Sequence, residues 1–408
     1  MKSNTQYASM SAQSSTFGFH TFSERIKLAP EQNARITCIG ELSAKVLQKV
    51  STLLGEVFES EDTKFPWLQK LMLGSIPKEH HGFARELQMA VGNHCPVNLF
   101  RADVVGGGRI AELQCPGSGW AYTRILENHY GIKPEDSPLL AAIKDWTNGE
   151  RTSWWLHDEK HERSVRFLVE ECHKIGVEIE VFTEDTFIAD SALQVIKRPP
   201  LPELIAHPEG RRLLERWRAG KVRMDLLPSM IPETKYLMAI LWHPAFADLF
   251  TEEERNLCPR TTLIMSRNQE VRLGEDSERA IAVDQLFERH PRDFILKYGG
   301  AQKDLRGGCH AVYKLDTGGV KLSDRMELFE RALVDWKNGE GWILQKFFPE
   351  FWPIARTLGR KPLQYNAIFR PHFYRNRDGQ VVQVANTLTA CPNWKVHAQS
   401  YAYLGLCV

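Results

Sequence analysis

The chain lacks the features that would assign it at once to several common functional classes. It has no run of about 18 apolar residues, so no segment reads as a membrane-spanning helix. No two of its eight cysteines form a C-x-x-C pair, a scatter that is typical of reduced thiols in a cytoplasmic protein. Its net charge of +1 gives no bulk attraction to nucleic acid or to a membrane surface. The composition therefore points away from nucleic-acid and membrane partners.

Three well-known site signatures are also missing. Neither a G-x-x-x-x-G-K-[ST] loop nor a G-x-G-x-x-G fingerprint occurs in the chain. His157 and His161 are spaced to share one helix face, but they lack the H-E-x-x-H order and an obvious third zinc ligand. What is present is an ordinary globular composition over 408 residues, with 43% hydrophobic and 25% charged residues. That length suits two or three domains.

Hydrophobic periodicity and turn residues divide the chain into four regions of mixed α+β character. The expected regions are a disordered start at 1–20, a mostly helical part at 21–95, a hairpin followed by an α/β unit at 96–230, and a region of strands and helices at 231–408. Within them, residues 40–58 have helical apolar spacing, 152–189 read as a β-α-β unit, and a long helical region is expected after Pro232.

The most informative segment is a predicted β-hairpin around the triple glycine Gly106–Gly108. Arg101 and Asp103 share one face of the first strand, and Glu112 and Gln114 share one face of the second. Strand pairing would bring two carboxylates, an amide oxygen and a guanidinium together. Two buried carboxylates are costly unless they are paired or bind a cation, and oxygen ligands suit Mg²⁺ better than zinc. The alternative is a solvent-exposed face with Arg101 and Asp103 as a surface ion pair.

Two further patterns lie in the C-terminal half. Lys297 ends an apolar strand and precedes a glycine-rich loop, 299–308, whose backbone N–H groups could approach phosphate oxygens; a simple turn is the alternative. The apolar strand at 342–348 carries Gln345 and Lys346 near its end. A polar pair in this position could line an adenine pocket, or it could be the amphipathic end of an ordinary sheet strand. The aromatic residues of this region, Phe347, Phe348, Phe351 and Trp352, are expected in the core.

In their order along the chain, these patterns resemble the circularly permuted ATP-grasp ligases, typified by glutathionylspermidine synthetase and eukaryotic glutathione synthetase. Arg101–Asp103 matches the R-x-D of those families, and Glu112–Gln114 matches their E-x-N except for the final residue. Thr234–Lys235 matches the N/T-K element that precedes a helix. Lys297 matches the phosphate-binding lysine, and Gln345–Lys346 matches the hinge strand.

The resemblance covers about residues 96–408 and implies an α+β, circularly permuted ATP-grasp-like fold, with an α/β pre-ATP-grasp domain and a helical N-terminal region. It implies an ATP- and Mg²⁺-dependent ligase that joins a small carboxylate, such as an amino acid or peptide, to an amine through an acyl phosphate. The implied site residues are Arg101 and Lys297 for catalysis; Lys235, Lys297, Gly299, Gly300, Gly307, Gly308, Gln345 and Lys346 for ATP; Arg101, Arg370, Asn386 and Lys395 for substrate; and Asp103, Glu112, Gln114 and Asp304 for the metal.

Two departures from the family pattern leave alternatives open. Gln114 is one methylene longer than the asparagine of the family, and two residues separate Asp304 from the paired glycines that begin at Gly307. A catalytically inactive ATP-grasp fold that binds nucleotide or a partner is therefore one alternative. A sugar- or peptide-binding protein whose hairpin is purely structural is another.

Overall fold

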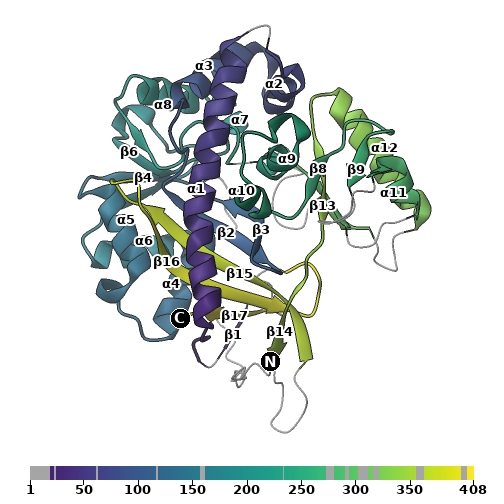
Figure 1. Cartoon of the computed structure of the whole chain (residues 1–408). Coiled ribbons are helices and arrows are strands. Elements are labelled where there is room, and N and C mark those ends of the chain that lie inside the picture. Colours follow the sequence, from purple (N-terminus) through teal and green to yellow (C-terminus); the bar gives the residue numbers. More distant parts are fainter. Residues whose placement is uncertain are drawn as a thin grey trace.

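The computed structural model has mixed α+β architecture around one large sheet (Figure 1). It describes residues 19–22, 24–60, 63–115, 118–156, 161–232, 234–272, 280–289, 294–301, 311–315, 321–354, 363–396 and 402–408. The mixed α+β class expected from the sequence is confirmed. Of the expected disordered start, residues 1–18 lie outside the described residues.

Seven strands of the described chain form the large sheet. Their spatial order is β1 (His20–Thr21), β17 (Tyr403–Leu406), β16 (Val381–Cys391), β15 (Leu363–Arg375), β2 (Leu99–Val105) and β3 (Arg109–Gln114), and β14 (Glu350–Ile354) pairs with the other end of β15. β1 is parallel to β17, and the other neighbours are antiparallel. The expected hairpin, β2–β3, thus shares a sheet with the C-terminal strands, although the expected regions separate them.

Helices cover both faces of this sheet. The long helix α1 (Pro30–Glu59) crosses one face in front of β15 and β16 (Figure 1). Its first residue is a proline, which suits a first helical turn because that turn needs no N–H from it. Its apolar side pairs with Phe100 and Leu388 of the sheet in the main core. The helix α4 (Ser118–His129) packs against β16 and β17, and its Leu126 lies beside Leu404.

A second, parallel sheet follows the hairpin in sequence. Its order is β5 (Ile179–Phe182), β4 (Thr152–Trp155), β6 (Gln194–Lys197) and β7 (Arg223–Met224). The helix α6 (Glu162–Lys174) connects β4 to β5, which confirms the expected β-α-β unit. The neighbouring helices are α5 (Pro138–Thr147), α7 (Leu201–Ala206) and α8 (Pro208–Arg218).

A third, antiparallel sheet faces the hairpin from the C-terminal half. Its order is β12 (Val312–Lys314), β11 (Phe294–Tyr298), β13 (Trp342–Lys346) and β8 (Thr261–Leu263). The helices α11 (Val283–Arg289) and α12 (Leu322–Lys337) share a separate core with it, in which Leu296 and Leu344 meet Phe287 and Phe329. A small hairpin of β9 (Glu270–Arg272) and β10 (Ala280–Ala282) lies before α11.

One expectation about the helices is wrong. In place of a long helical region after Pro232, the chain forms α9 (Tyr236–Trp242) and a separate short helix, α10 (Glu252–Asn256). The break comes at His243, whose ψ of 128° is extended, because the residue before a proline is pushed out of helical geometry. The N-terminal helices α2 (Pro66–Leu73) and α3 (His81–Val91) complete the fold.

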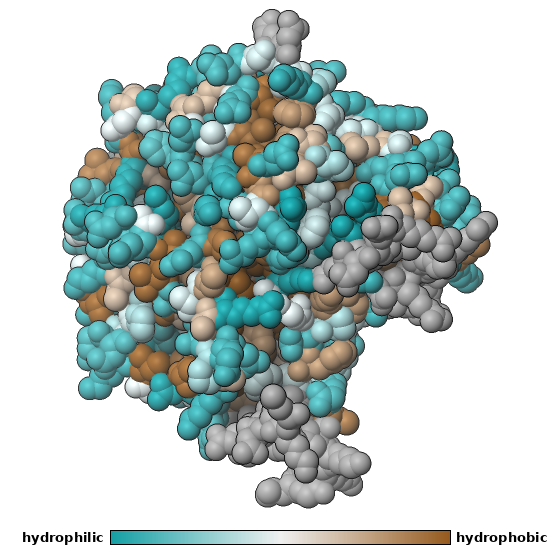
Figure 2. Space-filling view, viewed as in Figure 1, coloured by the Kyte–Doolittle hydropathy of each residue, from teal (hydrophilic) through white to brown (hydrophobic). Residues whose placement is uncertain are grey.

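The molecular surface seen in Figure 2 is mostly hydrophilic, with hydrophobic side chains in small separate groups. Such a mixture is normal for a surface in contact with water. Among the helices of the described residues, none combines the length and the apolar character that crossing a bilayer requires.

Candidate functional site

The hairpin places the side chains of Arg101, Asp103, Glu112 and Gln114 on one face of the large sheet. Arg101 pairs with Gln114, and Asp103 pairs with Glu112, so all four lie on the same side. Beyond Asp103 the register shifts, because β3 carries Ala111 as an extra residue. A bulge of this kind leaves backbone groups of the extra residue unpaired within the sheet. The carbonyl oxygen of Ala111 is thereby available, and it accepts a hydrogen bond from another part of the site.

Two buried arginines converge on Asp103. Arg101 Nη2 lies 3.1 Å from Asp103 Oδ1, and Arg370 Nε of β15 lies 3.2 Å from the same oxygen. Arg101 also donates to the amide oxygen of Gln114, while Arg370 donates to Val396 O at 3.1 Å. Burial lowers the pKa of Arg101, and the adjacent Asp103 opposes that effect. The alternative of a solvent-exposed Arg101–Asp103 pair is thus wrong, because both residues belong to a buried cluster.

Lys297 reaches the hairpin from β11. Its ammonium donates to Gln345 Oε1 on the neighbouring strand β13 at 2.6 Å and to Ala111 O at 3.2 Å. Burial lowers the pKa of Lys297 to about 8, although the negative charge of Glu112 acts in the opposite direction. Gln345 is oriented by its amide nitrogen, which donates to Thr261 Oγ1 at 3.1 Å. Lys297 is therefore a buried cation held between two sheets.

Lys235 precedes α9, as the sequence pattern predicts, and it also points to the hairpin. Its ammonium lies 3.5 Å from Glu112 Oε1, and its backbone N–H donates to Gly299 O at 2.8 Å. The Lys235 side chain is 13% exposed, whereas that of Glu112 is 30% exposed. The pair is therefore close to solvent within the site.

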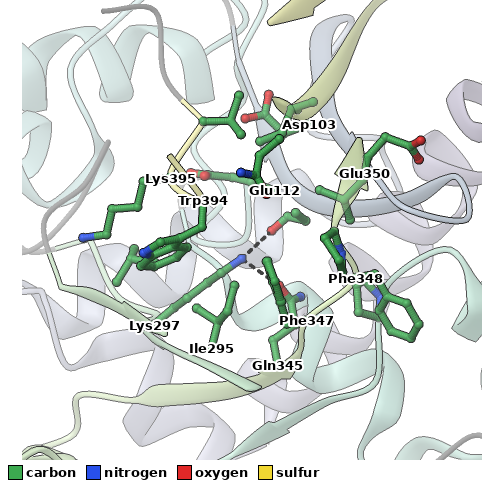
Figure 3. A pocket seen from close by; sticks show the side chains of 18 of the residues that line it. Asp103, Glu112, Ile295, Lys297, Gln345, Phe347, Phe348, Glu350, Trp394 and Lys395 are labelled. Carbon is green, nitrogen blue, oxygen red and sulfur yellow. Dashed lines mark hydrogen bonds between the residues drawn. The ribbon is translucent and has the colours of Figure 1, made fainter. Parts of the chain in front are cut away.

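A cleft between the large sheet and the third sheet (Figure 3) is lined by Asp103, Glu112, Lys235, Lys297 and Gln345. Its empty volume, including the part that opens to solvent, is about 840 Å³. Its charged lining residues are Asp103, Glu112, Glu350, Lys235, Lys297, Lys346 and Lys395. With Arg101 and Arg370 beside Asp103, basic groups outnumber acidic groups by six to three. A cleft with this charge balance suits an anionic ligand.

The aromatic wall of the cleft corrects a prediction made from the sequence. Phe347 and Phe348 were expected in the core, but both are only half-buried and line the cleft, and Phe351 is 50% exposed. Trp394, from the segment after β16, completes this wall, and its ring centroid lies 6.5 Å from that of Phe347. Figure 3 shows Trp394 and Lys395 on one side of Lys297, with Phe347 and Phe348 on the other. The only sequence signal for Phe347 and Phe348 was their position next to Lys346.

Six predicted residues of the described chain do not line the cleft: Arg101, Gln114 and Arg370, which belong to the cluster around Asp103, and Asn386, Gly299 and Gly300. Asn386 of β16 shares a face with Leu388, on the side of the sheet that packs against the main core, so it points away from Arg370. Gly299 and Gly300 follow β11, where added Cβ atoms would lie 2.4 Å from Tyr236 Cε1 and 2.3 Å from Tyr298 Oη, respectively. Because Gly299 N–H already donates to Gly341 O at 2.8 Å, close packing accounts for this glycine.

Asp304, Gly307 and Gly308 lie outside the described residues, as does His157 of the predicted histidine pair. One buried residue that the sequence pattern did not single out is His372, which pairs with Arg101 across β15 and β2. Its pKa is lowered to about 3 by burial and by the charge of Arg101. His372 is therefore neutral near neutral pH, and it accepts or donates one hydrogen bond with Thr123 Oγ1 at 3.1 Å.

The cleft contains carboxylate oxygens that fit Mg²⁺, but these protein groups alone do not fill its coordination sphere. Within the described residues, no three histidine, cysteine or acidic side chains gather as a metal site. Asp103 and Glu112, however, face each other on paired strands at the cleft wall. Mg²⁺ is commonly held by one or two carboxylates while waters and phosphate oxygens fill its other positions. The two carboxylates therefore fit Mg²⁺ that arrives with a phosphate ligand, whereas the amide oxygen of Gln114 is engaged by Arg101.

Comparisons with known proteins give distant likenesses only. No family model and no curated protein matches the chain. Among solved structures, a glutathione synthetase-like effector from Globodera pallida is similar at a TM-score of 0.48 and 10% identity, over 94% of this chain and 88% of that one. D-cycloserine synthetase is similar at a TM-score of 0.31 and 14% identity, over 58% of this chain and 90% of that one. At these scores and identities, neither likeness carries a conclusion about this chain.

Proposed function

We propose that the protein is an ATP-dependent carboxylate–amine ligase with a circularly permuted ATP-grasp-like fold. One observation carries the proposal: residues from five separate segments, singled out by sequence pattern, line the same cleft. These are Asp103 and Glu112, Lys235, Lys297, Gln345 with Lys346, and Lys395. A purely structural hairpin would have no reason to meet the four other segments, each of which carries a lysine, in one cationic cleft between two sheets.

The reaction begins with a carboxylate, which is a poor electrophile because oxide is a poor leaving group. A carboxylate oxygen would attack the γ-phosphorus of ATP, and the bond to the β–γ bridging oxygen would break to release ADP. An amine would then attack the acyl carbon of the acyl phosphate, phosphate would leave, and the nitrogen would lose a proton to give the amide. Phosphoryl transfer of this kind depends mainly on positioning and charge neutralisation.

The residues of the cleft divide between these tasks. Lys297 and Lys235 would hold the phosphates, with the charge of Lys297 directed into the cleft by its bonds to Gln345 and Ala111. Asp103 and Glu112 would hold Mg²⁺, which supplies neutralisation of the phosphate charge when bound. Arg101, with Arg370 beside it, would stabilise the acyl phosphate or the oxyanion formed by amine attack.

The part of the cleft next to Lys346, Phe347 and Phe348 would take the base. Gln345 and Lys346 end the strand β13, and the rings of Phe347 and Phe348 follow directly. Aromatic side chains with a few polar groups are the usual lining of such a pocket. Lys395, beside Trp394, would meet phosphate or substrate. Gly300, Asp304, Gly307 and Gly308 keep their predicted roles toward phosphates and metal as part of this proposal.

The test measures ATP binding and phosphate release separately. Calorimetry with Mg·ATP should detect binding, and a screen of amino acids, short peptides and polyamines should find pairs that stimulate phosphate release. Glu112→Gln should abolish stimulated release while the protein remains folded. Glu180→Gln, which alters an exposed carboxylate paired with Arg151, is the matched control and should leave release unchanged.

Each outcome leads to a different function. Binding without release under any substrate pair would favour the inactive ATP-grasp alternative. Failure to bind ATP, with or without Mg²⁺, would overturn the proposal and favour a sugar- or peptide-binding protein. Full release in Glu112→Gln would remove the metal role assigned to this carboxylate.

A further inference from the structure

The triple glycine at the hairpin tip makes a close contact across the cleft wall. Gly106 N–H donates to Phe348 O at 3.3 Å. An added Cβ at Gly106 would lie 2.6 Å from Pro349 O and 3.3 Å from Phe348 O. Both are backbone atoms, so they cannot rotate away as a flexible side chain could. Gly106 therefore allows an approach of two backbones that a larger residue would prevent.

The partner of this contact belongs to the nucleotide side of the proposed site. Phe348 and Pro349 connect β13 to β14 and line the cleft. The guanidinium of Arg109 lies 4.3 Å from the ring centroid of Phe348, so a second residue of the hairpin contacts the same segment. From the other side, Ile110 N–H donates to Leu257 O at 2.8 Å. The tip is thus fixed between two parts of the chain.

We propose that Gly106 is a positioning residue, which seats the hairpin tip on the Phe348–Pro349 backbone and thereby sets where Asp103 and Glu112 stand relative to a bound nucleotide. This inference rests on the proposed function. Asp103 lies on β2, and Gly106 directly follows the last residue of that strand, so a displaced tip would displace the carboxylate. Loss of the contact should therefore reduce the increase in ATP affinity that Mg²⁺ provides more than it reduces ATP affinity without Mg²⁺.

The experiment compares ATP affinity in Mg²⁺ with ATP affinity in EDTA, using the full chain. Gly106 does not have a positive φ, so Gly106→Ala adds the clash without intrinsic backbone strain. In this variant, the factor by which Mg²⁺ raises ATP affinity should be smaller by roughly tenfold or more. Phosphate release should fall by a similar factor, since small displacements in an active site have large effects. Its affinity in EDTA should remain that of the unaltered protein.

Gly107→Ala is the matched control. Gly107 has a φ of +73°, and an added Cβ would meet nothing within 4 Å, so this variant adds backbone strain without the contact. It should lower stability and retain the Mg²⁺-dependent gain. If Gly106→Ala does not fold, Arg109→Gln removes the second contact without adding volume and should reduce the gain.

The outcomes separate this inference from the function on which it rests. A full Mg²⁺-dependent gain in a folded Gly106→Ala, or an equal loss in both glycine variants, would overturn the positioning role and leave the ligase proposal standing. If Gly106→Ala is unfolded, a full gain in Arg109→Gln would overturn it. If the unaltered protein does not bind ATP at all, the proposed function fails, and this inference fails with it.

Discussion

Two buried clusters of charge, one between the helices α4 and α6 and one at the hairpin β2–β3, differ in how their charges are satisfied. In the first, beside the parallel sheet, Arg124 is fully buried and pairs with Glu171 at 2.7 Å and Glu127 at 3.1 Å. It also donates to Ile132 O at 3.1 Å, while Ser137 donates to Glu127 at 2.6 Å. Each charged group in this cluster therefore has protein partners.

The cluster at the hairpin has a different balance. Four cations, Arg101, Arg370, Lys297 and Lys235, meet only two carboxylates, and the cleft opens directly beside them. Desolvation of unmatched charge is costly, so such an excess persists where a ligand supplies the missing countercharge. Under the proposed function, the first cluster stabilises the fold and the second binds the phosphates of ATP.

The largest expected effect tests the first cluster. Arg124→Met would leave the buried carboxylates of Glu127 and Glu171 without their main partner, which should lower the free energy of unfolding by about 3–5 kcal/mol. Denaturant unfolding measures this change. Nucleotide affinity of the folded fraction should remain unchanged. Arg151→Met, at an exposed pair, should cost less than about 1 kcal/mol. Equal losses in both variants would contradict the structural role of Arg124.

Lys297→Met tests the second cluster and should show the reverse pattern. Removal of a buried charge that contacts phosphate should weaken ATP binding by about 1.5–3 kcal/mol, or roughly ten- to a hundredfold. The free energy of unfolding should not fall, because burial already opposes the charged form of Lys297. Calorimetric titration and denaturant unfolding give the two values. Lys144→Met, at an exposed lysine, is the control. Unchanged affinity in Lys297→Met would mean that the cation excess does not serve phosphate.

These two clusters also show what sequence patterns can predict. The hairpin and the Lys297 strand follow from local alternation and turn residues, whereas the position of Lys235 before a helix comes from the family resemblance; the structure confirms these elements. The pairing of β15 with β2, which brings Arg370 to Asp103, depends on tertiary packing. No local pattern distinguishes that partner from another strand.

Where the position predicted for a residue from the sequence differs from its position in the structure, the difference also has a physical reason. Asn386 and Thr387 are adjacent on β16, so one residue decides which face of the sheet a side chain occupies. Phe347 and Phe348 are apolar whether they fill a core or line a cleft, and only the position of the facing sheet decides between these. Gly299 suits both a phosphate loop and close packing against Tyr236, so its place after β11 does not decide between them.

A smaller effect is expected at Lys235, which is nearer to solvent than Lys297. Lys235→Met should weaken ATP binding by about 0.7–1.4 kcal/mol, or roughly three- to tenfold. The same variant should strengthen binding of Mg²⁺ alone, because Glu112 would lose the cation that lies 3.5 Å away. Titrations with ATP in EDTA and with Mg²⁺ alone test the two signs separately. A fall in both affinities would indicate that the ion pair mainly supports the local structure.

The smallest expected effect is a proton taken up when ATP binds. Burial lowers the pKa of Lys297 to about 8, so about half of the free protein carries a neutral amine at pH 8. Phosphate beside the amine favours its charged form and raises the pKa, so binding at pH 8 should take up about half a proton per chain. At pH 6.5 the amine is already charged, and uptake at this group should be close to zero. Calorimetry in two buffers with different ionisation enthalpies measures the number of protons, and Lys297→Met should abolish the difference between the two pH values. The same uptake in this variant would assign the proton to another group.

Above pH 8 the free energy of unfolding should rise toward pH 10.5, because the unfolded chain then holds a proton that the folded amine has released.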